Sequence, residues 1–498
     1  MESGMLAYGL LAFATVAYLF RWLMPPKSSL PDIPAVTPTT PILSFWGSIK
    51  NLTHNKELIL EGYHKYKGRA FKVPELFRWH VIVTGPKLVD ELRKAPDEML
   101  SFKDAVIEQI SMDWTFGPAI MGNPYHIPLI RSNLTRNLVV LFSGVREELM
   151  AAFNDAIPPS DDWIAVPALE TLMTIVSRTS NRIFVGLPTC RNPDYVDLNI
   201  KFTIDAVTTG IMLNMVPAFL RPIVGRLLTS VPKSIERGVK HLGPVIKERY
   251  RMVEEYGHDY EGKPNDMLSW LIDEAEGVET GARELVLRIL SINFGAIHTS
   301  SNSFTHALYR LASNPEWTLT LREEVEQVVK EEGWTKNALQ KMHKVDSFLK
   351  ESQRCDGLGS VSITRLAVQD FTFSDGTFIP KGTFVSAAMM PIHHDEEFYE
   401  NPEMFNPWRF AEKRSGEGEE LKHQLVSTNT EYITFGHGKH ACPGRFFAAN
   451  ELKGMLAHVV TTYDVKLEKD GEIPPPSWIA QSLVPNRTGK VLFRKRRD

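Results

Sequence analysis

The chain is poor in cysteine, with only Cys190, Cys355 and Cys442 among its 498 residues. So few thiols exclude a disulfide framework, which favours a reducing compartment for the main body of the protein. They also exclude a closed zinc site built mainly of thiolates, because such a site needs paired cysteines at short spacing.

The sequence also lacks a large excess of either charge. Its formal net charge of −4 predicts no nucleic-acid partner. It contains no flavin-binding or dinucleotide-binding motif, so electrons for any redox chemistry must come from a separate protein. Hydrophobic residues make up 43% of the chain, which is enough to fill a large core.

Charge is missing altogether from Ser3 to Phe20, a stretch at the short end of what a membrane-spanning helix requires. A cleaved signal peptide is the alternative, but no positive charge precedes the run and no clear cleavage site follows it. We therefore predict a membrane anchor over residues 1–24. Arg21 and Lys27 follow the run, so the positive-inside rule leaves the main body in the cytosol. The prolines of residues 25–41 predict a stiff, extended linker.

The stretch Phe435 to Arg445, FGHGKHACPGR, carries the chemistry. Its glycines permit a tight turn that a ligand can approach closely. The apolar run from Phe446 to Val460 predicts a helix, and Pro443 suits a first helical position. Cys442 is therefore expected at a helix N-terminus, where the thiolate form, a soft ligand for iron, is favoured. The plainer interpretation is a buried free cysteine beside an ordinary turn.

Five residues of this stretch resemble the haem-binding signature of the cytochrome P450 family of haem-thiolate monooxygenases: Phe435, Gly438, His440, Cys442 and Gly444. The resemblance implies haem b (iron protoporphyrin IX), with Cys442 as the iron ligand and His440 near a propionate. It also implies a mainly α fold with a small β portion, and we assign residues 42–498 to one haem-thiolate catalytic domain.

A second resemblance lies in the stretch from Arg283 to Ala312, which reads as one long helix ended by Asn314-Pro315. At its middle, Gly295, Ala296, His298 and Thr299 resemble the small-residue, acid and threonine arrangement of the family's central helix, with His298 at the acid position. The resemblance implies that Thr299 assists proton delivery, the alternative being that its hydroxyl only bonds back to a helix carbonyl. His298 is expected to titrate near neutral pH, so that it could relay protons, the alternative being that it bonds elsewhere in the protein.

Other motifs follow in the family's order. Glu351 and Arg354, three residues apart, face one side of a helix, and Arg409 in FNPWRF resembles the third member of a buried structural cluster. Arg365 matches a position that often binds a haem propionate. His126 and Arg131 are further propionate candidates, although the family's usual tryptophan before this arginine is missing.

The function implied is insertion of one oxygen atom from O2 into a lipophilic substrate, with electrons from NADPH through a separate reductase docking near Lys439 and Arg445. An isomerase or dehydratase needing neither oxygen nor reductase is the alternative, and a haem sensor lacks any signalling region. The apolar stretch Ile204 to Val231 predicts a substrate roof that dips into a membrane, or two core helices joined by a proline turn. We expect a terpenoid or steroid-like substrate of secondary metabolism, at a single-pass anchor in the endoplasmic reticulum membrane.

Overall fold

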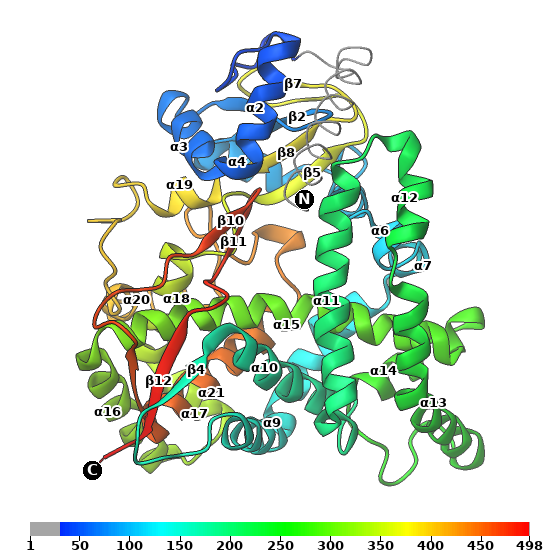
Figure 1. The fold of residues 1–498 in the computed structure, drawn as a ribbon, viewed down its shortest axis with the longest axis vertical. Helices are drawn as coiled ribbons and strands as arrows, with labels where there is room; N and C mark the ends of the chain where they lie inside the picture. The colour runs from blue at the N-terminus through cyan, green and yellow to red at the C-terminus, as the bar shows by residue number, and fades with distance from the viewer. Residues whose placement is uncertain (1–29, 498) are drawn as a thin grey trace, which may run out of the picture.

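The structure is a computed structural model that describes residues 30–497. The predicted anchor and the first part of the predicted linker lie outside the described residues. Helices form most of the molecule, and the largest sheet lies toward one end of its long axis (Figure 1). Within residues 30–497, no helix is both long and apolar enough to cross a membrane.

The helices differ widely in length. The longer ones are α2 (Pro41–Thr53), α3 (Asn55–Lys65), α4 (Pro86–Lys94), α5 (Phe102–Gln109), α9 (Thr135–Ala156), α10 (Ala168–Phe184), α11 (Pro193–Asn214), α12 (Arg221–Leu228), α13 (Val231–Tyr256), α14 (Met267–Glu274), α15 (Ala282–Ser313), α16 (Pro315–Glu332), α18 (His343–Cys355) and α21 (Arg445–Thr462). The shorter ones are α6 (Met112–Thr115), α7 (Ala119–Gly122), α8 (His126–Pro128), η1 (Leu129–Leu134), η2 (Thr189–Arg191), η3 (Ala218–Leu220), η4 (Gly277–Thr280), α17 (Lys336–Lys341), α19 (Met389–His393), α20 (Arg409–Arg414) and η5 (Gly438–His440).

The strands of residues 30–497 are short and belong to four sheets. They are β1 (Ala70–Pro74), β2 (Trp79–Val83), β3 (Leu100–Ser101), β4 (Ile164–Pro167), β5 (Ser362–Ala367), β6 (Phe371–Thr372), β7 (Phe378–Ile379), β8 (Phe384–Ala387), β9 (Tyr463–Leu467), β10 (Ser477–Ile479), β11 (Ser482–Val484) and β12 (Lys490–Lys495). The largest sheet has the order β1-β2-β8-β5-β3, in which only β2 and β8 run parallel. A second sheet has the order β4-β12-β9. The mainly α fold with a small β portion is thus confirmed.

Helix α15 runs through the middle of the molecule, and it confirms the long helix predicted from the sequence (Figure 1). Its end is set by Asn314, whose side chain accepts a hydrogen bond from the Glu316 backbone N–H and so caps the next helix. Pro315 occupies the first turn of α16, where a missing N–H is tolerated. Asn314 and Pro315 therefore end α15 and begin α16 as a separate helix.

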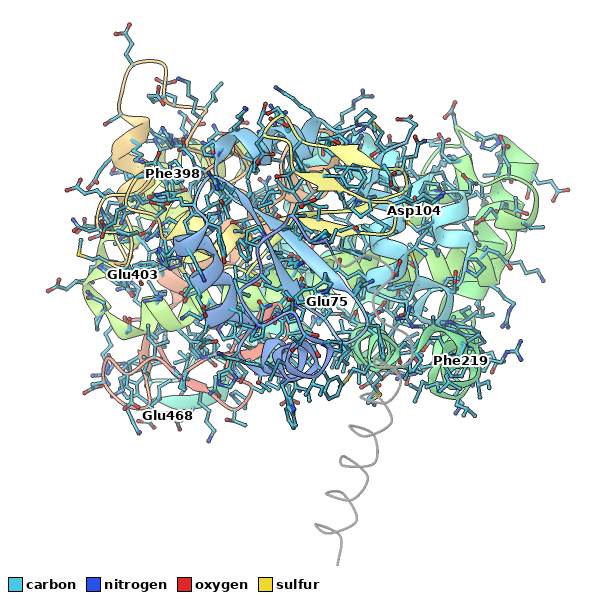
Figure 2. The ribbon with its side chains drawn as sticks, turned by 90° about the horizontal axis from the view of Figure 1, so that it is seen from above. Glu75, Asp104, Phe219, Phe398, Glu403 and Glu468 are labelled. Carbon is cyan, nitrogen blue, oxygen red and sulfur yellow. The ribbon has the colours of Figure 1, made fainter. Side chains whose placement is uncertain are left out.

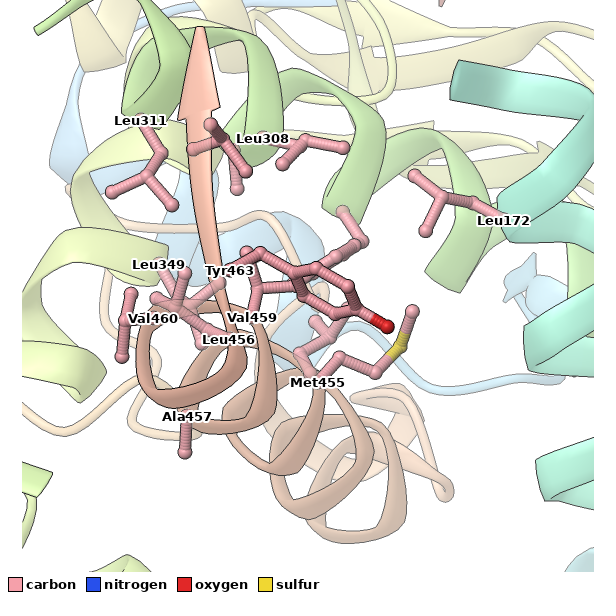
Figure 3. Close-up of a cluster of buried hydrophobic side chains, with 14 of the residues drawn as sticks. Leu172, Leu308, Leu311, Leu349, Met455, Leu456, Ala457, Val459, Val460 and Tyr463 are labelled. Carbon is pink, nitrogen blue, oxygen red and sulfur yellow. The ribbon is translucent and has the colours of Figure 1, made fainter. Parts of the chain in front are cut away.

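The main core packs α15 against α21, α10 and α18. Figure 3 shows Leu308 and Leu311 of α15, Leu172 of α10 and Leu349 of α18 around the apolar side chains of α21. Each is buried, and burying such a side chain contributes about 1.5–3 kcal/mol. This core holds α15 and the segment leading into α21 in fixed relative positions.

The stretch from Ile204 to Val231 is divided into separate helices at its prolines, as the sequence predicts. Pro217 is extended and separates α11 from η3, and Pro222 lies in the first turn of α12. Several large apolar side chains of this region are exposed, among them Phe219, Ile223 and Leu227 at 61%, 61% and 80%. Figure 2 shows Phe219 at the periphery of the molecule. The stretch is therefore not two core helices joined by a turn.

Candidate functional site

A largely apolar cavity of about 340 Å³ lies between α15 and the turn that leads into α21. Cys442, Pro443 and Gly444 line one wall, and Gly295, Ala296 and Thr299 of α15 line another. Its size falls within the range of small-molecule and cofactor sites. Of the predicted site residues, the structure brings Cys442, Phe435 and Thr299 to this cavity.

The Cys442 turn is fixed by backbone geometry. The backbone N–H of Cys442 donates to the carbonyl of Phe435 at 2.8 Å, which folds the segment back on itself. Gly436 and Gly438 have φ values of +68° and +78°, in the left-handed region that favours glycine. The predicted tight turn is thus confirmed, and it presents one thiol to the cavity.

Two details of the expected helix N-terminus are wrong. Helix α21 begins at Arg445, so Pro443 lies in the preceding turn and not at the first helical position. Burial raises the pKa of the Cys442 thiol, and the N–H groups of Gly444 and Arg445 with the Arg445 charge offset this only in part. Desolvation therefore outweighs the helix end at this thiol, and a bound iron ion would be needed to deprotonate it.

Thr299 faces the cavity, but its hydroxyl is engaged. Its Oγ1 donates to the carbonyl of Gly295 at 2.8 Å, one helical turn earlier. This is the back-bonded geometry that the sequence left as the alternative to proton delivery. The same oxygen keeps its acceptor capacity, so Thr299 can still hold a water in the cavity.

His298 is in contact with an aromatic cluster. Its ring centroid lies 5.0 Å from that of Phe294, which in turn packs edge-on against Phe116 at 4.8 Å. Burial lowers the pKa of His298 to about 4, so the expectation that it titrates near neutral pH is wrong. The ring is therefore neutral at pH 7, and its role as a proton relay stays a prediction.

Arg365 fits a carboxylate that the chain does not provide. It is 1% exposed, its Nη1 donates to the carbonyl of Thr364, and its Nε and Nη2 have no hydrogen-bond partner among the described residues. His440 lies nearby, since both side chains contact the ring of Phe102. Because a buried guanidinium without partners is costly, Arg365 fits a propionate of a haem, whereas the Nε2 of His440 already pairs with Asp97 at 2.7 Å.

The other two propionate candidates, Arg131 and His126, lie in different surroundings. Arg131 lies on the side of the Cys442 turn, where its Nη2 donates to the carbonyl of Lys439 at 3.3 Å. His126 is instead bonded to Arg288 at 2.9 Å, and burial lowers its pKa to about 4. Arg288 in turn forms an ion pair with Glu279 at 2.7 Å, and a contact of His126 with a propionate stays a prediction.

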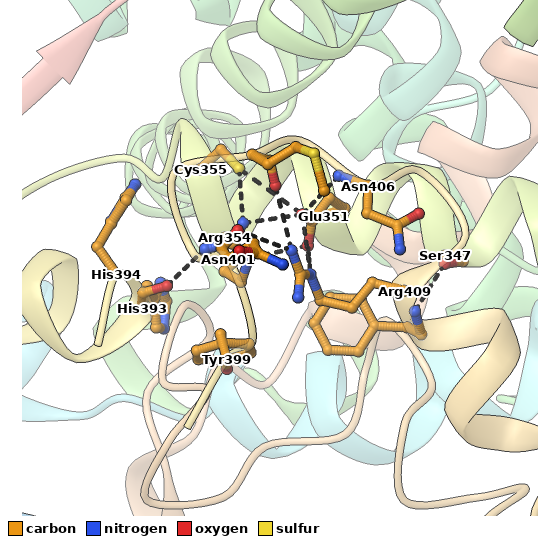
Figure 4. Close-up of polar contacts among 12 residues, drawn as sticks. Ser347, Glu351, Arg354, Cys355, His393, His394, Tyr399, Asn401, Asn406 and Arg409 are labelled. Carbon is orange, nitrogen blue, oxygen red and sulfur yellow. Dashed lines mark hydrogen bonds and ion pairs between the residues drawn. The ribbon is translucent and has the colours of Figure 1, made fainter. Parts of the chain in front are cut away.

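The Glu351, Arg354 and Arg409 cluster is confirmed (Figure 4). Arg354 binds both carboxylate oxygens of Glu351 at 2.8 Å, and the Nε of Arg409 lies 3.1 Å from each. Arg354 also donates to the carbonyl of His393, which ties α18 to the chain beyond the main sheet. The cluster lies outside the lining of the cavity and is structural.

Sequence reasoning missed two charged residues inside the apolar helix α21. Lys453 is buried and pairs with Asp346 at 2.8 Å. Glu451 is buried against Ser180, whose hydroxyl donates to it at 2.8 Å. The signal was available, because a charge within an otherwise apolar helical run requires a buried partner.

Comparison with known proteins gives a consistent result. The family model described as cytochrome P450 matches residues 37–493. Cytochrome P450 monooxygenase 151 of Postia placenta is 47% identical over 491 residues, covering 97% of this chain and 98% of the relative. Cytochrome P450 monooxygenase 103 of the same fungus is 44% identical, covering 100% and 99%. A relative in Ganoderma lucidum, cytochrome P450 monooxygenase CYP512U6, is 35% identical, covering 98% and 96%.

A solved structure supports the same fold. Retinoic acid-bound cyanobacterial CYP120A1 aligns with a TM-score of 0.64 and 17% identity, covering 90% of this chain and 96% of that one. At this identity the likeness bears on the fold alone.

Proposed function

Because the chain belongs to the cytochrome P450 family and is one of its haem b monooxygenases, we propose that it oxidises a terpenoid or steroid-like compound with electrons from NADPH. These electrons would come through a separate NADPH-dependent reductase. The single observation that carries the proposal is the apolar cavity with Cys442 on one wall and Thr299 on another.

The residues of the site would have the following roles. Cys442 would ligate the iron, and Arg365 and His440 would hold the propionates, since both flank Phe102. Haem b, when bound, would supply the activation of dioxygen, which thiolate ligation by Cys442 would favour. Thr299 would hold a water in the cavity and pass a proton from it, which positioned hydroxyls and waters can do.

The substrate class follows from the apolar surroundings. Phe116 packs edge-on against both Phe294 and Phe202, which forms a buried aromatic cluster beside the middle of α15. The cavity itself is lined by apolar side chains that include Phe184, Ile292 and Phe447, and this lining offers a rigid hydrocarbon skeleton apolar contact and few hydrogen-bond partners. This supports a terpenoid or steroid-like substrate of secondary metabolism.

The exposed apolar surface supports a membrane location. Besides the region of Phe219, helix α2 exposes Ile42, Leu43 and Trp46. Phe45 on the same helix packs with Leu76 and Met215, so α2 and the end of α11 adjoin one another. We propose that this surface rests on the endoplasmic reticulum membrane, with residues 1–24 as anchor, residues 25–41 as linker and residues 42–498 as the cytosolic catalytic domain.

We place the reductase on the side of Cys442 opposite α15. Lys439 and Arg445 lie within three residues of Cys442 in the sequence, and α9 exposes the apolar side chains of Val139 and Val140. A mixed basic and apolar surface suits a transient partner with an acidic docking face.

The test is oxidation of a panel of terpenoids, steroids and small polar compounds by the full-length protein with a fungal NADPH-dependent reductase under isotopically labelled dioxygen. We expect one labelled oxygen atom in each product and no product when reductase or NADPH is omitted. A product formed without either would instead establish the isomerase or dehydratase alternative. Labelled product only from small polar compounds would overturn the proposed substrate class.

A further inference from the structure

A groove of about 490 Å³ between α9, α16 and the end of α21 has no part in the mechanism above. Its volume falls within the range of small-molecule sites. The side chains that line it differ from those that line the cavity with the Cys442 thiol. A ligand in this groove would therefore occupy a site separate from that of the substrate.

Arg146 of α9 lines the groove as a cation without a counter-ion among the described residues. Its guanidinium lies over the ring of Trp334, 4.2 Å from the ring centroid, and within residues 30–497 it forms no hydrogen bond or ion pair. Burial lowers the pKa of Arg146, and no carboxylate in this part of the chain opposes the effect. A partly buried guanidinium is stabilised by a carboxylate, to which it can donate two parallel hydrogen bonds. The groove therefore has a place for a carboxylate that these residues do not supply.

His458 of α21 adds a second polar group without a partner. It lines the groove together with Arg146, it is 8% exposed, and its Nε2 has no hydrogen-bond partner among the described residues. Burial and the charge of Arg146 lower the pKa of His458 to about 4, so the ring is neutral at pH 7. The Thr462 hydroxyl lies 3.3 Å from its Nδ1 and can donate to it. In that tautomer Nε2 carries the ring proton and can donate to an anion beside Arg146.

The rest of the groove sets the charge and the polarity of a ligand. Val329 and Trp334 give it apolar walls, and Lys330 adds an exposed second positive charge. Among the described residues that line the groove, Glu326 is the one carboxylate, and Arg496 pairs with it. A carboxylate in the wall repels an anion of several charges more strongly than an anion of one charge. The groove therefore fits an apolar molecule with a single negative charge.

We propose that the groove binds an amphipathic organic monocarboxylate. Its carboxylate accepts hydrogen bonds from the guanidinium of Arg146 and from the Nε2 of His458, and its apolar body lies along Val329 and Trp334. Met150 of α9 completes the apolar contact. No covalent bond is made or broken on binding. The inference goes beyond the proposed function and does not depend on it, because different residues line the groove and the cavity.

Isothermal titration calorimetry of the full-length, haem-loaded protein with 2-naphthoate tests the proposal. We expect one molecule to bind, while the haem absorption spectrum stays unchanged because the probe does not enter the cavity. The amide 2-naphthamide has nearly the same shape but no charge. It should bind ~10-fold or more weakly, because hydrogen bonds to a charged group contribute at least this factor. Acetate has the charge but no apolar body, so it should not bind at the same concentrations.

Variants test whether the probe lies in the groove. Arg146→Gln should weaken 2-naphthoate binding by ~10-fold or more and leave 2-naphthamide binding unchanged. Trp334→Ala should weaken the binding of both probes, because it removes an apolar wall. Arg136→Gln is the matched control, since it removes the same charge from an exposed position of α9 outside the groove, and it should keep the parent affinity. An unchanged haem spectrum in each variant shows that the fold is kept.

Equal affinities for 2-naphthoate and 2-naphthamide, or no measurable binding of either, would overturn the proposal without any variant. Equal losses in Arg146→Gln and Arg136→Gln would also overturn it, because they would show attraction to the net charge of α9 alone. Binding of acetate as tight as that of 2-naphthoate would show an adventitious ion only. A change in the haem spectrum that persists in Arg146→Gln would place the probe in the cavity and contradict the groove. None of these results bears on the proposed function, which the labelled product tests.

Discussion

Thr299 and His298 are neighbours in sequence that the structure puts in different surroundings. The Thr299 hydroxyl faces the cavity while donating to Gly295, and the His298 ring packs on Phe294. Adjacent residues of a helix point about 100° apart, so one element can present only one of them squarely to a ligand. Thr299 is therefore the residue for which we predict proton delivery at this helix.

Thr299→Ala should uncouple the enzyme, because a water in the cavity loses its acceptor. We expect NADPH consumption to continue with more peroxide formed per product. His298→Ala is the comparison: it should leave both the coupling and the pH dependence unchanged, since its pKa of about 4 keeps the ring neutral at working pH. Full coupling in Thr299→Ala would limit this side chain to helix packing, and a changed pH dependence in His298→Ala would restore its relay role.

The sequence was informative about these residues to a limited extent. A cysteine among glycines and a threonine after small residues can be recognised because both depend on local chain geometry, as the φ values of Gly436 and Gly438 illustrate. The shifted pKa of His298 and the bonding of His126 to Arg288 could not be predicted, because they depend on burial and on a residue 162 positions away.

At the scale of elements, buried ion pairs hold α18 and α21 in place. Glu351 of α18 binds Arg354 and Arg409, and Lys453 of α21 binds Asp346 of α18. The cluster of Glu351 was predictable from two short motifs that a family resemblance joins. The pairing of Lys453 was not, because nothing near it in sequence identifies its partner.

Arg354→Leu should destabilise the protein by about 3–5 kcal/mol, because it leaves the buried Glu351 carboxylate with one of its two arginines missing. Chemical denaturation of the haem-loaded protein measures this change. Arg251→Leu on α13, which breaks a surface pair with Glu248, should leave the midpoint nearly unchanged. Similar midpoints for both variants would contradict the structural role of the cluster.

Glu451 makes stability depend on pH in a predictable direction. Its pKa rises from 4.5 to about 7 on folding, so between these values the folded protein binds more protons than the unfolded chain, and stability falls as pH rises. The shift corresponds to about 3 kcal/mol, fully expressed above pH 7. Relative to the parent, Glu451→Gln should therefore become more stable as the pH rises from 5 to 8. Denaturation at both pH values measures this change. A stability difference between variant and parent that does not change with pH would show that the Glu451 carboxyl lies in a more polar environment.

At the scale of the whole molecule, the apolar face around Phe219 and α2 supports the proposed membrane location, and so does the uncharged sequence from Ser3 to Phe20. The sequence alone indicated the apolar stretch before α13. That its side chains are exposed follows from the packing of α11 and α12 against the rest of the chain.

Removal of residues 1–24 should release part of the protein from membranes and leave haem incorporation intact. The remaining membrane-bound fraction should fall further when Phe219, Ile223 and Leu227 are replaced by serine, because these exposed side chains add apolar contact. Fractionation of cell extracts measures both effects. Secretion of the full-length protein would contradict the anchor, and complete release by truncation alone would leave the apolar face without a membrane role.

The central claim is that Cys442 ligates haem iron as a thiolate, and the absorption spectrum of the reduced carbon monoxide complex tests it most directly. The parent protein should show the strongly red-shifted Soret band of a thiolate-ligated haem. Cys442→Ala should lose this band, while Cys190→Ala, at a buried cysteine that does not line the cavity, should keep it. Retention of the band in Cys442→Ala would contradict the account.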